Sequence, residues 1–168
     1  MFSEVKKQEW EQRDRYETMG AKFKNKPAEQ WPKMRILWNT NPDEFYRSLD
    51  GCSQSDLKNQ YPDGLLVGEI PTSDIYKKLV STSKVYDYID FWRKCRNRRA
   101  CGLIGRWMDG NSVTPPLIVP FKNEIFIEGG NHRFNIARLY GEKNITFISP
   151  SNEKKDIERI IPSVKWMP

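Results

Sequence analysis

The sequence predicts an α+β protein, in which a small sheet is surrounded by helices and preceded by a helical extension. Two observations lead to this expectation. Short apolar runs bounded by Gly and Pro, which are typical of buried strands, fall within residues 65–150. Helical periodicity separates those runs, and residues 1–35 are charged and helix-prone. We expect three consecutive segments: an N-terminal helical extension and connector (1–64), a core (65–150) and a C-terminal tail (151–168).

The N-terminal segment is expected to contain one or two charged helices and then a connector of short elements. Turn-forming residues recur through the connector, including Asn41-Pro42, Asp50-Gly51 and Pro62-Asp63-Gly64. Between them, residues 43–49 have the composition of a short helix that Asn41 or Thr40 caps.

The core elements follow one another at short intervals. Ser73 or Asp74 is a candidate N-cap for a helix over 75–80, and Ser83 is expected to cap the next helix, which continues to Cys95. Lys122-Asn123 is expected to join two strands as a hairpin, and Gly141 to end the helix that Asn131 or His132 opens. The expected strands cover 65–70, 117–121, 124–128 and 144–148, and a short helix is expected around 156–161.

The composition fits one small domain with appendages. The chain has 168 residues, of which 38% are hydrophobic, and its six Trp, seven Tyr and eight Phe make a core feasible. No run approaches the roughly 18 apolar residues of a membrane span, and the charged N-terminus is unlike a secretory signal. We therefore expect a cytoplasmic protein with no membrane partner.

The cysteine and histidine content excludes several classes of site. Cys52, Cys95 and Cys101 are odd in number and lack CxxC spacing, which fits neither a disulfide framework nor a zinc knuckle. His132 is the single histidine, so sites that need two are excluded. Cys95 and Cys101 lie beside a basic run, where positive charge can lower a thiol pKa, but the favoured interpretation is that both are buried or incidental cysteines.

The turn between the last predicted hairpin strand and its helix carries most of the chemical information. Gly129 and Gly130 let the backbone turn sharply and let a ligand approach without Cβ obstruction. The amides that open the helix suit an anion, with Arg133 as a bidentate donor and His132 as a switchable one. The pattern indicates a phosphate site, with the alternative that a strand-to-helix turn merely needs glycine.

The element order and four segments of the chain resemble the ParB/sulfiredoxin-like superfamily. The resemblance covers about residues 65–150, and its specific part is the Gly-Gly-Asn-His-Arg turn with the strands around it. It implies a small mixed sheet with surrounding helices. The matching segments are Glu69–Ile75, Ser83–Val85, Val113–Val119 and Phe126–Phe134.

The resemblance implies a nucleotide site. The turn in this superfamily looks like a phosphate cradle, which assigns binding of ATP or another nucleoside triphosphate to Gly129, Gly130, Asn131, His132 and Arg133. Lys84 stands where sulfiredoxin-type members carry a phosphate-binding Lys, with the alternative that it is a solvated lysine at the start of a helix. Sulfiredoxins have their catalytic Cys at the position of Asn131, so sulfinic-acid reduction has no nucleophile here.

Other members of the superfamily resemble kinases, nucleotide hydrolases or CTP-dependent DNA clamps. Phosphoryl transfer needs charge neutralisation and a positioned base. The expected catalytic residues are Glu69, His132 and Arg133, with Glu69 matching a carboxylate near the first strand of kinase-like members. Asp74 and Glu128 are the candidate ligands for Mg²⁺.

A basic run indicates a polyanionic partner. Trp92 and Trp107 stand at its ends, and aromatic rings can stack on unpaired bases. The alternative is a solvated helix face that pairs with acids elsewhere. The cations of the run are Arg93, Lys94, Arg96, Arg98, Arg99 and Arg106.

These observations favour a kinase or NTPase that acts on or with nucleic acid. The first alternative is a non-catalytic nucleotide- or DNA-binding module of ParB type, and the second is a metal-dependent nuclease. The sequence leaves the oligomeric state open.

Overall fold

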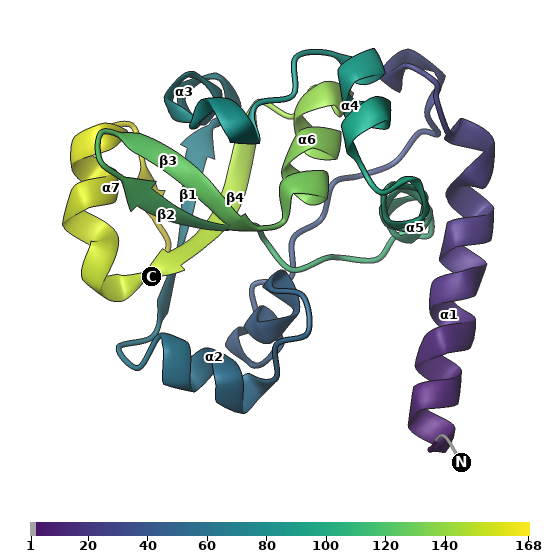
Figure 1. The fold of residues 1–168 in the computed structure, drawn as a ribbon, viewed down its shortest axis with the longest axis horizontal. Helices are drawn as coiled ribbons and strands as arrows, with labels where there is room; N and C mark the ends of the chain where they lie inside the picture. The colour runs from purple at the N-terminus through teal and green to yellow at the C-terminus, as the bar shows by residue number, and fades with distance from the viewer. Residues whose placement is uncertain (1–2) are drawn as a thin grey trace. The chain divides into compact units, whose positions relative to one another are not determined.

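The computed structural model describes residues 3–168 and divides into two compact units (Figure 1). The helical unit comprises Met1–Leu37 and Val85–Val113, and the sheet unit comprises Trp38–Lys84 and Thr114–Pro168. Each unit is therefore built from two separate stretches of chain. This division differs from the three consecutive segments expected from the sequence (1–64, 65–150 and 151–168).

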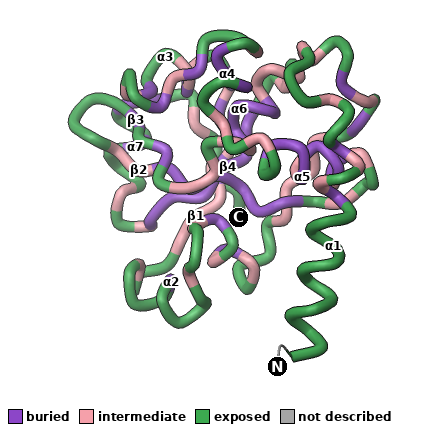
Figure 2. The backbone as a smooth tube through the Cα atoms, turned by 45° about the vertical axis from the view of Figure 1, so that its right-hand side comes forward, coloured by how far each residue is buried: buried purple, intermediate pink, exposed green. Residues whose placement is uncertain are grey.

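The helical unit is held together by a close contact between two helices, α1 (Glu4–Gly20) and α5 (Asn97–Met108). A Cβ at Gly20 would lie 1.8 Å from the Cys101 carbonyl oxygen, and a Cβ at Gly105 would lie 2.2 Å from that of Tyr16. The two backbones touch because these residues are glycine. The first turns of α1 lie outside this contact and are exposed (Figure 2).

An aromatic cluster fills the rest of this unit's core. Trp31 packs against Phe91 and Trp92 of α4 (Tyr88–Lys94), with ring centroids 6.3 Å away in both cases. The indole Nε1–H groups of Trp31 and Trp92 both donate to the Lys26 carbonyl oxygen at 2.9 Å. The remaining elements of the unit are the 3₁₀ turns η1 (Ala21–Phe23) and η2 (Ala28–Gln30).

The sheet unit contains a five-stranded mixed sheet in the order β3-β2-β4-β1-β5. Strands β2 and β4 pair in parallel, and the other neighbours are antiparallel. The strands are β1 (Leu65–Pro71), β2 (Leu117–Phe121), β3 (Glu124–Gly129), β4 (Asn144–Pro150) and β5 (Lys165–Trp166). The other elements are η3 (Pro42–Ser48), α2 (Gln54–Gln60), α3 (Thr72–Lys78), η4 (Ser81–Ser83), α6 (Asn131–Tyr140), η5 (Ser151–Glu153) and α7 (Lys154–Ile160).

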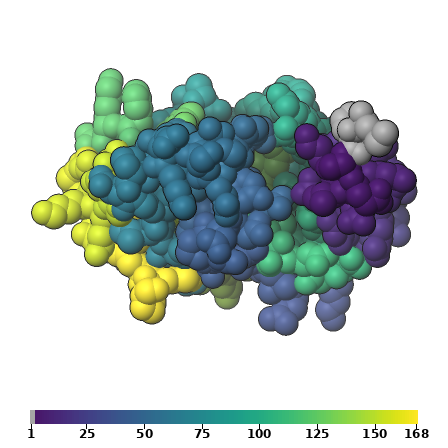
Figure 3. Space-filling model, turned by 90° about the horizontal axis from the view of Figure 1, so that it is seen from below, coloured from purple at the N-terminus to yellow at the C-terminus, as the bar shows by residue number. Residues whose placement is uncertain are grey.

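The two faces of this sheet bury different side chains. On one face, Phe45 of η3 and Leu57 of α2 form a cluster with Leu117 and Ile148. In Figure 3, η3 and α2 contribute to the blue surface over this unit. On the other face, the Phe147 ring packs 5.5 Å from Trp166, and a Cβ at Gly68 would lie 2.6 Å from that ring.

Most of the expected elements are confirmed within one or two residues. The hairpin turns at Lys122, which has φ 57°, and the helix after Gly130 ends at Gly141, which has φ 105°. Asn41 caps η3 by accepting a hydrogen bond from the Asp43 amide. No helix in residues 3–168 is long and apolar enough to cross a membrane.

Two expectations about helix starts are wrong. α3 begins at Thr72, directly after Pro71, so neither Ser73 nor Asp74 is its N-cap. Ser83 lies in a 3₁₀ turn, and the following helix begins only at Tyr88, with Asp87 accepting from the Asp90 amide as the N-cap. This helix stops at Lys94, so the basic run is split between α4 and α5.

Candidate functional site

The predicted phosphate turn lies between β3 and α6, and its glycines are required by packing. Gly130 has a left-handed backbone (φ 94°, ψ 26°). A Cβ there would lie 2.8 Å from Pro116 Cα, and a Cβ at Gly129 would lie 2.1 Å from the Ser48 carbonyl oxygen. Close approach of two other chain segments therefore accounts for both glycines, which is the alternative left open by the sequence.

Arg133 ties the start of α6 to the same two segments. Its Nη1 donates to the Thr114 carbonyl oxygen at 2.7 Å, and its Nη2 donates to the Ser48 carbonyl oxygen at 2.9 Å. Ser48 Oγ in turn donates to the Pro115 carbonyl oxygen at 2.9 Å, and Ser48 is almost fully buried. The guanidinium is thus engaged as an organiser of the turn, a role that the sequence did not indicate.

The first turn of α6 combines the positive end of a helix with polar side chains. It contains no acidic residue, Asn131 is exposed and His132 is half-buried. One turn further on, the buried Asn135 donates through Nδ2 to the Asn131 carbonyl oxygen at 2.8 Å. The electrostatics of this helix end favour an anion.

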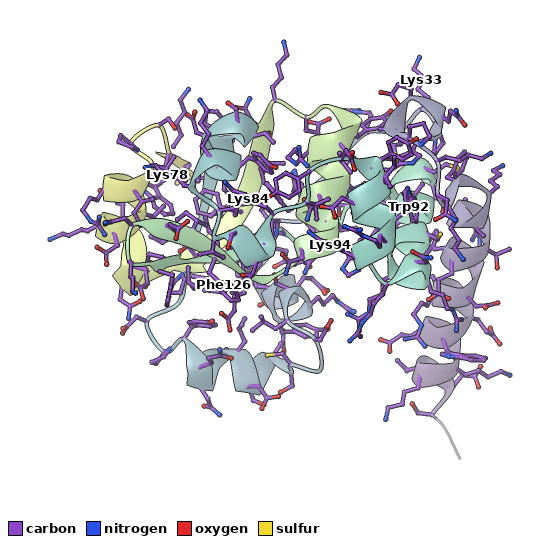
Figure 4. The ribbon with its side chains drawn as sticks, turned by 45° about the horizontal axis from the view of Figure 1, so that its top comes forward. Lys33, Lys78, Lys84, Trp92, Lys94 and Phe126 are labelled. Carbon is purple, nitrogen blue, oxygen red and sulfur yellow. The ribbon has the colours of Figure 1, made fainter. Side chains whose placement is uncertain are left out.

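Two cations converge beside α6. Arg138 lies at i+7 from Asn131, on the same face of the helix, and its Cζ is 4.3 Å from the centroid of the Tyr76 ring of α3. Lys84 Nζ is 5.4 Å from the same centroid, and Figure 4 labels this residue. Because both charges contact one ring, they lie within about 10 Å of each other. Burial lowers the pKa of Arg138, as expected for a cation withdrawn from water.

Sequence reasoning missed Arg138 because it followed only the turn. The i, i+4, i+7 spacing of Asn131, Asn135 and Arg138 was the available signal. Lys84 was singled out, but it follows the 3₁₀ turn η4 in extended backbone and does not open a helix.

The candidate base Glu69 lies away from the turn. It is on β1, where it is paired with Thr146 of β4 and Lys165 of β5. Strands β4 and β2 separate β1 from β3, so three interstrand spacings, about 14 Å, divide Glu69 from the strand that ends in Gly129.

The two candidate metal ligands are also apart. Asp74 accepts a hydrogen bond from Ser163 Oγ at 2.7 Å. Glu128 precedes the turn. The pKa of Tyr61 is raised mainly by the burial of Tyr61 and, to a smaller extent, by the charge of Glu128. Within residues 3–168, no three His, Cys, Asp or Glu side chains gather as a metal site.

The basic run acquires acidic partners that are distant in sequence or adjacent to it. Asp90 binds Arg93 at 2.9 Å and Lys94 at 3.1 Å, and Glu17 of α1 binds Arg98 at 2.8 Å. The pKa of Asp90 falls to about 2, because the carboxylate accepts from the Tyr86 amide and then from the two cations. The cation Arg106 lies 4.9 Å over the Tyr16 ring.

The tryptophans at the ends of the run are core residues, which corrects their expected role in stacking on bases. Trp92 is 5% exposed and Trp107 is 1% exposed. Trp107 Nε1–H donates to the Leu37 carbonyl oxygen at 3.1 Å, so both indoles are satisfied inside the helical unit.

The neighbouring positive charge does not activate the thiols, which agrees with the interpretation of Cys95 and Cys101 as buried or incidental cysteines. Burial raises the pKa of Cys95 to about 11, and it raises the pKa of Cys101 and of Cys52 as well. The thiols therefore stay protonated near neutral pH and are poor nucleophiles.

Comparison of the chain with protein-family models, with curated proteins and with solved structures gives no match. The resemblance to the ParB/sulfiredoxin-like superfamily therefore rests on the motifs quoted above and on their order.

Proposed function

We propose that the sheet unit binds a nucleoside triphosphate, ATP or a related one, together with Mg²⁺ at the start of α6, and transfers or hydrolyses its terminal phosphoryl group. One observation carries the proposal: Lys84 and Arg138 converge on Tyr76, and Arg138 lies in the last turn of α6, about 10 Å along the axis from the first turn, which favours an anion. A polyphosphate that bridges the two cations would contact both charges.

The residues take different roles in this proposal. The amides of Asn131 and His132 meet the phosphates, and Lys84 and Arg138 neutralise their charge. His132 holds or delivers a proton. Arg133 is a positioning residue, since it holds the turn through carbonyl oxygens of η3 and of the segment before β2.

A phosphate-bound Mg²⁺ needs only one or two protein carboxylates and keeps several waters. Glu128 directly precedes Gly129, and we assign it this role in preference to the other two carboxylates. Asp74 is bonded to Ser163, and Glu69 is three strand spacings from the turn.

Equilibrium binding of ATP with Mg²⁺ tests the site. We expect Lys84→Ala to weaken binding about tenfold, the size of a lost charge-assisted contact to phosphate. Lys84→Arg restores part of the affinity, and Lys78→Ala, an exposed α3 lysine, leaves it unchanged. Equal binding by all four proteins, or no binding by the wild type, contradicts the proposed site.

The non-catalytic alternative is favoured by the position of the expected base, since Glu69 lies three strand spacings from the turn. In that case the same turn holds a nucleotide and no bond breaks. Affinity that depends on Lys84, without release of the γ-phosphate, supports this alternative. The dispersed positions of Glu69, Asp74 and Glu128 give no support to a nuclease.

A further inference from the structure

The net positive charge of the protein is confined to the helical unit, because the charges of the sheet unit sum to zero. That unit holds 15 Lys and Arg against 9 Asp and Glu, whereas the sheet unit holds 13 of each. The net charge of +6 is therefore carried by the unit that lacks the candidate nucleotide turn. A charge imbalance confined to one unit indicates a polyanionic partner for that unit.

The structure gathers exposed cations from three segments around the α4–α5 junction. Hydrogen bonding of Trp92 to the Lys26 carbonyl oxygen fixes one segment against α4. The charge of Lys24 acts to lower the pKa of Cys101, which indicates that Lys24 lies near α5. We call this set the basic surface: Lys24, Lys26, Arg93, Lys94, Arg96, Arg98 and Arg99, all exposed.

The ion pairs of this surface leave its cations accessible. The side chains of Arg93 and Arg98 remain 76% and 80% exposed while paired with Asp90 and Glu17. Asp90 and Glu17 are only 9% and 14% exposed, but each guanidinium carries five N–H donors, of which the carboxylate takes only some. A phosphate can therefore compete for these guanidinium groups.

The position of three arginines works against the stability of α5. Arg96 is the N-cap and makes no side-chain capping bond, and the first turn carries Arg98 and Arg99 with no acidic residue. Cations at the positive end of a helix are unfavourable. A bound anion would offset this unfavourable placement of positive charge at the start of α5.

Exposed apolar side chains lie next to the cations. Tyr86 is 67% exposed and Ile89 is 62% exposed, and Lys94 Nζ lies 5.6 Å from the Tyr86 ring. Lys94 is labelled in Figure 4, together with Trp92 from the same helix. An accessible tyrosine among cations provides what the two buried tryptophans cannot, a ring on which a base can stack.

We infer that the basic surface binds single-stranded nucleic acid, with phosphates on its arginines and an unpaired base on Tyr86. Stacking requires a base that is not already stacked in a duplex, which favours a single strand. This inference uses residues of the helical unit only. It therefore stands or falls independently of the nucleotide site.

The test is fluorescence anisotropy of a labelled oligothymidine with the full chain at several salt concentrations. The logarithm of affinity is expected to fall linearly with that of salt, by about 0.7 per phosphate contacted. The double variant Arg96→Ala/Arg99→Ala should bind at least about tenfold more weakly and with a shallower slope. Tyr86→Ala should lose at least about fivefold with the slope unchanged.

A matched double variant on the sheet unit, Lys77→Ala/Lys78→Ala, removes the same charge and should retain wild-type affinity. Circular dichroism of each variant checks that the fold is intact. Equal affinity for a duplex of the same length overturns the single-strand assignment. Wild-type affinity of the Tyr86→Ala variant for the oligothymidine overturns it as well. If the Lys77→Ala/Lys78→Ala variant loses as much affinity as the Arg96→Ala/Arg99→Ala variant, the nucleic acid does not bind specifically at the basic surface. Binding of ATP by the Arg96/Arg99 variant should be unaffected, which separates this test from the nucleotide site.

Discussion

The Arg133 guanidinium donates to the Ser48 carbonyl oxygen at 2.9 Å across 85 residues of sequence, and this bond joins the first turn of α6 to the end of η3. The same guanidinium donates to Thr114, so three segments meet at one side chain. A Cβ at Gly129 would lie only 2.1 Å from the same Ser48 oxygen. The turn is thus shaped by the segments that contain Ser48 and Thr114, which pack against it. The groups that a ligand could bind are the first amides of α6 and the cations beside that helix.

Substitution of Arg133 is expected to act on stability before it acts on binding. Arg133→Ala removes two hydrogen bonds from a charged donor and leaves buried carbonyl oxygens without it, a loss of about 2–4 kcal/mol in the free energy of unfolding. Urea denaturation measures this loss, and Lys155→Ala, an exposed lysine of α7, should change the free energy by less than about 0.5 kcal/mol. Equal midpoints for the two variants would contradict the organising role.

The two ends of α6 offer a matched pair of glycine substitutions. Both Gly130 and Gly141 have positive φ, but only the former faces Pro116, and nothing lies within 4 Å of a Cβ at the latter. Gly141→Ala should cost about 1–2 kcal/mol from backbone strain alone. Gly130→Ala should cost at least about 1 kcal/mol more, because Pro116 must move. Thermal and urea unfolding compare the two, and equal losses would refute the close approach of Pro116.

Asp90 is expected to make stability depend on pH in the acid range. Its pKa falls from 3.8 to about 2 on folding, so the ionised form stabilises the fold above about pH 4, and this contribution is lost as pH falls towards 2. The melting temperature of Asp90→Asn should therefore lie furthest below that of the wild type above pH 4. The gap should narrow towards pH 2, and a gap that stays constant over this range would show that Asp90 does not titrate as described.

The thiols are expected to react slowly in the folded protein. With its pKa raised from 9.0 to about 11, Cys95 has roughly a hundredfold less thiolate at pH 8 than an ordinary cysteine. Alkylation followed by mass spectrometry should label Cys95 and Cys101 at least about tenfold more slowly in the native protein than in urea. Rapid native labelling of Cys95 would mean that the residue is less shielded from solvent than its half-buried position indicates.

Local patterns predicted β1 to β4, the hairpin and α6, because Gly, Pro and Asn residues separate these elements in the sequence. The two-residue strand β5 lies in the segment expected to be a charged tail. Gly130 and Gly141 mark the two ends of α6, and both adopt the left-handed backbone for which glycine is suited. The α+β class followed from the same patterns. The candidate turn was found in this way too, since it is a continuous stretch of five residues.

The features that depend on distant contacts were not accessible from the sequence. The division into two units depends on backbone contact of Gly20 and Gly105 with helices more than 80 residues away in sequence. Trp92 is buried in the core and donates to the Lys26 carbonyl oxygen, whereas its position beside the basic run had suggested that it stacks on bases. Arg133 was predicted to donate hydrogen bonds to a phosphate, because the carbonyl oxygens that it contacts belong to residues distant in sequence.

The most direct test of the central claim is the fate of γ-phosphate-labelled ATP incubated with the full chain and Mg²⁺, with and without single-stranded DNA. We predict that label leaves the nucleotide, onto DNA or as free phosphate, and that Lys84→Ala slows this release while Lys78→Ala does not. Retention of all label on ATP, together with no binding of ATP or CTP by the wild type, would contradict the nucleotide site and leave the glycine turn as a packing feature.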